Sequence, residues 1–171
     1  MLKPSTQLNS SAESNLGAVA DIQEEFKLDQ FFPYLARVFY SQITKAVSQI
    51  YEDQYGMKRY EWRAMVILAP QESLTSAEIM ERSSMDKVSV SRAVSALRKR
   101  GWILEQTNKK DGRSRLLKLS SDGRNVFQQL LPQMVALEQK ILDDLSSDEI
   151  ALLISLMKRV ENSATDTLIS K

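Results

Sequence analysis

Apolar residues recur every three or four positions in several stretches of this chain, and that spacing is typical of amphipathic helices. The first stretch covers residues 29–54, with Pro33 in its first turn and Gly56 just beyond its end. A second covers residues 59–69 and is followed by Pro70, which ends a helix. We predict one helix over each of these ranges.

Two shorter helices follow, and capping residues mark their starts. Thr75 and Glu78 have the spacing of a capping box, which predicts a helix ending near Arg82. After a three-residue break, Asp86 is suited to cap a second helix that runs to about Arg100. A helix, a short break and a second helix are the parts of a helix-turn-helix.

The next segment has the pattern of a β-hairpin. Residues 102–107 and 115–119 read as strands, and the loop between them contains the pair Asp111-Gly112. This pair between two apolar runs is a strong hairpin signal. We therefore predict a mainly α fold that includes one small hairpin.

The C-terminal part of the chain is again helical in pattern. A long helix is expected over residues 120–144, and Pro132 within it predicts a kink or a division into two helices. Ser146 and Glu149 form a second capping box, which opens a last helix. The N-terminus, in contrast, is rich in Ser, Asn and small residues, and we expect residues 1–28 to be a flexible arm.

Composition excludes several classes of function. The 171 residues contain neither cysteine nor histidine. The chain therefore has no thiolate nucleophile and no disulfide, and no imidazole that could act as a base or bind a metal. It also lacks a Gly-rich phosphate loop and a paired-carboxylate motif. We expect no enzyme, no metal site and no cofactor.

Hydropathy gives an expectation for the location of the protein. No apolar run approaches the roughly 20 residues that span a bilayer, and the N-terminus lacks the apolar core of a signal peptide. We expect a cytoplasmic protein without a membrane partner.

Charge is distributed unevenly, although the net charge is only +1. Residues 82–118 hold eleven lysines and arginines against three carboxylates, so this segment carries +8 and the remainder of the chain −7. A solvated cationic face would give the same count. The helix-turn-helix pattern beside the charge favours a polyanion instead, and we expect double-stranded DNA as the partner.

The second helix of the pair has one face suited to DNA. If Val90 lies at the centre of the buried face, Val94 and Leu97 lie beside it. The opposite face then mixes cations and small hydroxyls with one valine: Val88, Ser91, Arg92, Ser95, Arg98 and Lys99. Small side chains let a helix approach base edges, and arginine can bind guanine through two hydrogen bonds.

The N-terminal part of such a helix meets the bases. The expected base-reading end is Lys87, Val88, Ser89, Ser91 and Arg92. Val88 suits a thymine methyl group, and packing beneath the hairpin or the preceding helix is the alternative. Phosphates or solvent are expected around the residues farther along, Arg98, Lys99 and Arg100, and the first-helix N-terminus at Thr75 and Ser76 is another candidate phosphate site.

Three motifs occur in the order and spacing of a known family. The segment 111-DGRSRLLKLSSDG-123 is similar to a wing with Asp, any residue, Arg, Ser, then a strand ending in Leu-Thr/Ser and a Gly in the next helix. The segment 87-KVSVSRAVSALRKRGWI-103 is similar to a recognition helix. The third match is Trp62-Arg63 in the predicted helix over residues 59–69. Over about residues 30–165 the chain resembles winged-helix regulators of the MarR family.

The resemblance implies a winged helix-turn-helix with N- and C-terminal dimerisation helices. Residues 56–123 would form the DNA-binding lobe, and residues 29–55 with 124–171 the dimerisation region. A homodimer would place two recognition helices about 34 Å apart, which suits an inverted-repeat operator. Apolar faces on the terminal helices agree with a shared dimer core, for which the candidates are Phe31, Phe32, Leu35, Phe39, Leu152, Leu156 and Val160.

In the wing, the resemblance carries minor-groove insertion over to Arg113 and the bracing of that arginine over to Asp111. Asp111 and Gly112 are expected to make the turn. The neighbouring cations Lys109, Lys110 and Arg115 are expected to contact phosphates, which position the wing without reading sequence.

The resemblance also implies a repressor that a small organic ligand, often an aromatic acid, releases from DNA. The candidate pocket residues are Tyr34, Arg37, Tyr60, Trp62, Arg63 and Met65. For Trp62 and Met65, plain core packing is the alternative, and a repressor without any ligand is a further one. The alternative function is a winged-helix module that binds proteins and no DNA.

Overall fold

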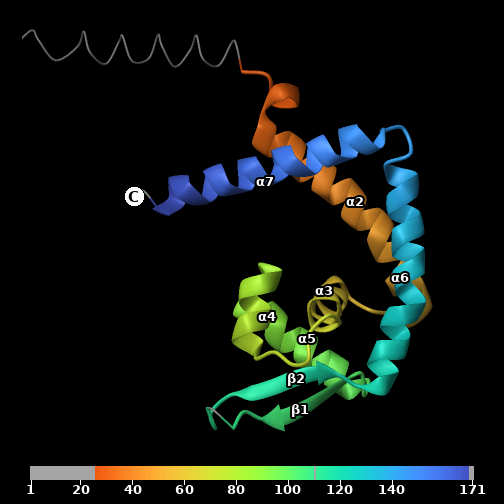
Figure 1. The fold of residues 1–171 in the computed structure, drawn as a ribbon, viewed down its shortest axis with the longest axis vertical. Coiled ribbons are helices and arrows are strands. Elements are labelled where there is room, and N and C mark those ends of the chain that lie inside the picture. The colour runs from red at the N-terminus through yellow and green to blue at the C-terminus, as the bar shows by residue number, and fades with distance from the viewer. Residues whose placement is uncertain (1–25, 110, 170–171) are drawn as a thin grey trace, which may run out of the picture. The chain divides into compact units, whose positions relative to one another are not determined.

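A computed structural model describes residues 26–109 and 111–169. Most of the expected arm, and Lys110, lie outside the described residues. The elements in chain order are η1 (Leu28–Gln30), α2 (Phe32–Tyr55), α3 (Arg59–Leu68), α4 (Ser76–Ser83), α5 (Lys87–Lys99), β1 (Ile103–Thr107), β2 (Arg115–Leu119), α6 (Ser121–Ile141) and α7 (Ser147–Ile169) (Figure 1). The predicted mainly α fold with one antiparallel hairpin is confirmed.

The chain divides into two compact units between Ala46 and Val47, within α2. In the first unit, the rings of Phe26 and Phe31 meet edge to face at 5.3 Å, and the Arg37 guanidinium lies 5.6 Å from the centre of the Tyr34 ring. Large apolar side chains of this unit are exposed, among them Phe31, Phe32, Leu35 and Phe39.

The second unit contains the hydrophobic core. Apolar side chains of α3, α4, α5 and the hairpin fill it, including Met65, Leu68, Ile79, Leu97 and Leu117. These elements pack together because each buries one apolar stripe, and the helix spacing in the sequence predicted those stripes. The core therefore fixes α5 and the hairpin in one rigid frame.

The break between α4 and α5 is a tight turn that requires one unusual backbone conformation. Ser84 has φ 53°, in the left-handed region that few residues other than glycine adopt. The buried Ser83 hydroxyl stabilises the turn by accepting a hydrogen bond from the Met85 amide at 3.3 Å. Asp86 then caps α5 by accepting from the Ser89 amide at 2.7 Å, as its position in the sequence predicted.

A close approach of α6 to the hairpin explains the glycine at position 123. The Ser120 hydroxyl caps α6 by accepting from the Gly123 amide, and it donates to the Gly101 carbonyl at 2.7 Å. A Cβ at Gly123 would lie 2.0 Å from the Trp102 carbonyl oxygen, a distance at which the backbone must shift. Glycine at this position is thus a packing requirement.

α6 continues through Pro132 as one helix, so the predicted division into two helices is wrong. Pro132 and Gln128, whose carbonyl loses its partner, are both exposed, and water can satisfy that carbonyl. Side-chain pairs hold α6 to the end of α2 on both sides of the proline. Gln133 exchanges hydrogen bonds with Gln54, and Gln129 accepts one from the Tyr55 hydroxyl.

α7 begins at the predicted capping box, where Ser146 and Glu149 exchange hydrogen bonds. Its described side chains include none that is buried. Apolar residues along it, among them Leu152, Leu156 and Val160, are 43–57% exposed. Among the described helices, α7 included, none is both long and apolar enough to cross a membrane.

Candidate nucleic-acid interface

Helix α5 presents the face that the sequence predicted. Val90 and Leu97 are buried, and Ala93 between them is buried as well. Val88 is 58% exposed, so within this chain it does not pack beneath the hairpin or the preceding helix. The other residues assigned to the outer face are exposed too: Ser91, Arg92, Ser95, Arg98 and Lys99.

Ser89 lies apart from this face. It is half-buried, and its hydroxyl donates to Asp86 at 3.2 Å as part of the helix cap. It lines a small pocket on the side of α5 that faces α3, together with Arg59, Tyr60, Arg63 and Met85. Ser89 thus occupies a different environment from Lys87, Ser91 and Arg92, with which the sequence grouped it.

Two of the three cations at the end of α5, Arg98 and Arg100, pair with carboxylates of this chain. Arg98 pairs with Glu105 of β1 at 3.2 Å. Arg100 pairs with Glu61 at 3.0 Å and donates to the carbonyls of Tyr55 and Gly56, each at 2.9 Å. Phosphate or solvent was expected around Arg100; the residue is exposed, but its guanidinium is bound by groups of the protein.

Two features make the Arg100 contacts strong. Glu61 is 3% exposed, so its carboxylate has little water to replace the guanidinium. The guanidinium also lies 4.8 Å from the centre of the Trp102 ring, within the range of a cation–π interaction. These contacts anchor the C-terminal end of α5 to the α2–α3 corner.

A sequence signal for this ion pair exists and was missed. Glu61 lies three, four and seven positions before Ala64, Met65 and Leu68, which form the buried stripe of α3. A carboxylate within an apolar stripe needs a buried partner. The spacing would have pointed to an internal cation, although it would not have identified Arg100.

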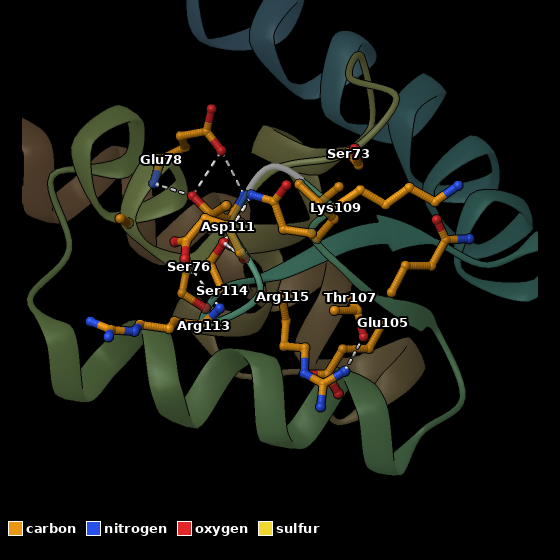
Figure 2. Close-up of a pocket in the computed structure, with 15 residues that line it drawn as sticks. Ser73, Ser76, Glu78, Glu105, Thr107, Lys109, Asp111, Arg113, Ser114 and Arg115 are labelled. Carbon is orange, nitrogen blue, oxygen red and sulfur yellow. Dashed lines mark hydrogen bonds between the residues drawn. The ribbon is translucent and has the colours of Figure 1, made fainter.

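The hairpin forms the wing, with Ile103 opposite Leu119 and Thr107 opposite Arg115. Leu74, just before α4, adds an isolated bridge to Leu117. The Arg115 guanidinium donates to the Thr107 hydroxyl at 2.7 Å across the strands. Figure 2 shows this bond, and it shows the Arg113 side chain extending in a different direction.

The tip of the wing uses Asp111 and Gly112 in a different way from a two-residue hairpin turn. The Asp111 carbonyl accepts from the Ser114 amide at 3.0 Å, which closes a turn over residues 111–114. Gly112 does not adopt the left-handed conformation. The Asp111 carboxylate accepts from the backbone amide of Arg113 at 3.1 Å, so this contact holds the Arg113 backbone and leaves its guanidinium exposed.

A groove of about 920 Å³ separates the wing from the start of α4 (Figure 2). Lys109, Arg113 and Arg115 contribute positive charge to its lining, and Ser73 and Ser76 contribute hydroxyls. The groove lies beside the wing residues to which the sequence assigned phosphate contacts.

The amide and hydroxyl of Thr75, in contrast, already bind a carboxylate of this chain. They donate to the Glu78 carboxylate at 2.7 and 2.8 Å, and these bonds lower the pKa of Glu78. A carboxylate therefore sits where a phosphate was expected at the α4 N-terminus, and the expectation for Thr75 is wrong. The capping box itself is confirmed.

The six candidate effector residues fall into three groups. Trp62 stacks between Tyr51 at 5.5 Å and Phe127 at 6.0 Å, and Met65 is fully buried, as the alternative of plain core packing expected. Tyr34 and Arg37 belong to the first unit. The remaining two, Tyr60 and Arg63, line the pocket beside Ser89.

Comparison with known proteins finds the family that the sequence motifs resemble. A family model described as the MarR family matches residues 55–114. An uncharacterised HTH-type transcriptional regulator of Bacillus cereus is 21% identical over 128 residues, which are 74% of this chain and 85% of the relative. A Bacillus subtilis regulator of the same description, YdgJ, is 19% identical over 71% of this chain and 74% of its own length.

Solved structures share the fold. A MarR/EmrR family regulator from Acinetobacter sp. ADP1 has a TM-score of 0.75 at 20% identity and covers 82% of this chain and 99% of its own. The PcaV regulator from Streptomyces coelicolor, solved with its natural ligand, has a TM-score of 0.68 at 24% identity and covers 81% and 97%. The family match covers the helix-turn-helix and the wing, and in sequence and fold the chain is similar to transcriptional regulators of the MarR family.

Proposed function

We propose that this protein binds double-stranded DNA as a homodimer and represses transcription at an inverted-repeat operator. The observation that carries the proposal is the outer face of α5, where small hydroxyls, cations and Val88 are exposed beside a cationic wing. A helix with small side chains fits the major groove closely, and its cations bind base edges and phosphates.

The roles of individual residues follow from their positions on this surface. On α5, Lys87, Val88, Ser91, Arg92 and Ser95 would face the major groove, and Lys99 would meet a phosphate. On the wing, Arg113 would enter the minor groove, while Lys109 and Arg115 would contact the backbone. Arg113 suits this role because its exposed side chain extends from a turn whose backbone Asp111 holds in place.

Exposed apolar side chains support dimerisation through residues 29–55 and 124–171. The N-terminal part of α2 exposes Phe31, Phe32, Leu35 and Phe39, and α7 exposes a row of large apolar side chains. Exposed apolar surface of this extent is typical of an interaction site. A two-fold dimer would leave a DNA-binding lobe, residues 56–123, on each side.

A small organic ligand would release the DNA, and a constitutive repressor that responds to no ligand is the alternative. The Streptomyces regulator of the same fold was solved with its natural ligand. A ligand acts by favouring the form of the protein that binds DNA less well, and its effect is limited by its differential affinity for the two forms. An aromatic carboxylate suits a site that offers arginine and tyrosine.

Selection of bound fragments from a random DNA library by the full chain tests the proposal. We expect an inverted repeat whose half-site centres are about one helical turn apart, because two recognition helices related by a two-fold axis are spaced in this way. Recovery of no enriched sequence would contradict sequence-specific binding. It would favour the alternative of a winged-helix module that binds other proteins.

A further inference from the structure

The Arg100 guanidinium lies where α2, α3 and α5 meet, and it also closes the end of α2. Its Nε pairs with Glu61 of α3, while its two terminal nitrogens donate to the carbonyls of Tyr55 and Gly56. Tyr55 is the last residue of α2. The last carbonyls of a helix have no partner within the helix and carry partial negative charge. Arg100 therefore caps α2 from the C-terminal end of α5.

Aromatic packing and a further hydrogen bond close the same junction. The Trp102 ring lies 4.8 Å from the Arg100 guanidinium and meets the Tyr55 ring edge to face at 5.8 Å. The Tyr55 hydroxyl in turn donates to Gln129 of α6. The C-terminal ends of α2 and α5 are thus joined to each other, and the end of α2 is also joined to α6.

Arg98, two positions earlier, makes a different kind of contact. It pairs with Glu105 of β1, so both partners belong to the DNA-binding lobe. Arg100 instead reaches Tyr55, which ends the N-terminal part of the proposed dimerisation region. Arg100 therefore joins the helix expected to read bases to the region expected to form the dimer.

The number and direction of the Arg100 contacts fix an orientation. A single ion pair would let two helices turn about it, but a planar guanidinium that uses all three nitrogens is held in one plane. Its acceptors lie on α3, at the end of α2 and at the residue after α2. The C-terminal end of α5 is therefore held at a fixed angle to α2, and this angle also directs the opposite, base-reading end of α5.

We propose that Arg100 is a positioning residue that sets the separation of the two α5 helices in the dimer, and with it the half-site spacing that the protein accepts. In a two-fold dimer a change in the angle between α2 and α5 occurs in both lobes, so its effect on the separation is doubled. Half-site spacing follows the separation of the recognition helices. The inference rests on the proposed function, because it requires a dimer that binds an inverted repeat.

Loss of the junction would affect base recognition and spacing differently. The outer face of α5 would keep its side chains and its helix, so affinity for a single half-site would be retained. A looser angle would let the dimer bind repeats at spacings that the wild type rejects. A residue that only stabilised the fold would affect both properties alike.

The test uses the full chain and one matched pair of variants. Arg100→Lys keeps a cation beside Glu61, but an ammonium group cannot reproduce the planar fork that binds the two further carbonyls. Arg98→Lys makes the same change two positions away, at an ion pair within the lobe. Thermal unfolding verifies that each variant is folded at the temperature of the measurements.

The first measurement needs no DNA. The chain contains no cysteine, so Glu81→Cys, at an exposed position of α4, introduces one spin label per protomer. Pulsed electron paramagnetic resonance then gives the distribution of distances between the two labels of a dimer. We expect a narrow distribution in the Arg100 protein and in Arg98→Lys, and a clearly broader one in Arg100→Lys. Equal widths in all three would overturn the inference.

The second measurement compares three kinds of duplex: a single half-site, the selected inverted repeat, and the same repeat with one or two base pairs added or removed at its centre. We expect the wild type and Arg98→Lys to bind the altered repeats about ten-fold more weakly than the selected one. Arg100→Lys should bind the single half-site as the wild type does, and its discrimination between repeats should fall to about three-fold or less.

The outcomes separate the inference from the proposed function. A wild type that is monomeric, or that binds no repeat, overturns the proposed function and this inference with it. A wild type that prefers one spacing while folded Arg100→Lys keeps the same preference overturns the inference alone. A parallel loss of half-site affinity and spacing discrimination in Arg100→Lys also overturns it, because that result indicates a purely structural role.

Discussion

Arg100 and Arg113 both belong to residues 82–118, the segment with net charge +8, but their surroundings in the structure are opposite. Arg100 binds the buried Glu61 carboxylate and two backbone carbonyls, and its guanidinium lies against Trp102. Among the described residues, none forms an ion pair with Arg113, whose side chain is exposed at the tip of the wing. A charge count therefore overestimates the surface available to DNA, and the geometry of each arginine decides its role.

The largest expected effect concerns Arg100. We predict that Arg100→Ala lowers the free energy of unfolding by about 3 kcal/mol, because it leaves the Glu61 carboxylate buried without its cation. Urea unfolding followed by tryptophan fluorescence measures this change. Lys99→Ala is the matched control and should alter stability by less than about 0.5 kcal/mol. Equal stability of the two variants would contradict the structural role of Arg100 and leave it no different from Lys99.

Arg92 is the corresponding test on the outer face of α5. We predict that Arg92→Ala weakens binding to the selected DNA by about 2 kcal/mol and relaxes the preference at one base pair, because an arginine that binds a base edge carries sequence information. Competition between the selected duplex and single-base variants measures both effects. A uniform loss across all the duplexes would reassign Arg92 to a phosphate contact.

A smaller effect is expected at Lys109 on the wing. Lys109→Ala should weaken binding to all sequences alike and reduce the salt slope by about one, since a phosphate contact releases a counterion without reading bases. Binding isotherms at several salt concentrations show the slope. A loss of preference for particular sequences would contradict the positioning role.

The smallest effect is the acid dependence of the capping carboxylates. Hydrogen bonds from Thr75 hold the pKa of Glu78 below its usual value of 4.5 in the folded state. Stability from this group is therefore fully present above about pH 4.5 and is lost as the pH falls through the lower folded pKa. Thermal unfolding between pH 6 and pH 3 should show a weaker acid loss in Glu78→Gln than in the wild type. Identical profiles would exclude this contribution.

Local features of the fold were predictable from the sequence, and long-range partners were not. The caps at Thr75, Asp86 and Ser146 involve residues three positions apart, so their spacing alone identifies them. The pairing of Glu61 with Arg100 spans 39 positions and depends on how α3 and α5 pack. The sequence pattern gave the outer face of α5 correctly because helical periodicity determines it.

Two misjudged elements show where local rules fail. Pro132 was expected to kink a helix or to divide it in two, and the division is wrong: α6 continues through it, with Gln129 and Gln133 bonded to the end of α2 on either side. The helix start at Thr75 was a candidate for phosphate, but the Glu78 carboxylate that completes the cap already occupies it. In both cases, neighbouring side chains decide the result: they bond to α2 beside the proline, and they fill the anion position at the start of α4.

The central claim, that this surface binds DNA through an exposed wing arginine, is tested most directly by Arg113→Ala. Anisotropy titrations of a labelled selected duplex at fixed salt compare the variant with the wild type. We predict a loss of about 1–3 kcal/mol in binding, with the unfolding temperature unchanged, because the proposed role of Arg113 is a DNA contact and its exposed side chain lies outside the core. Unchanged DNA affinity in a normally folded variant would contradict the account and favour a module that binds proteins.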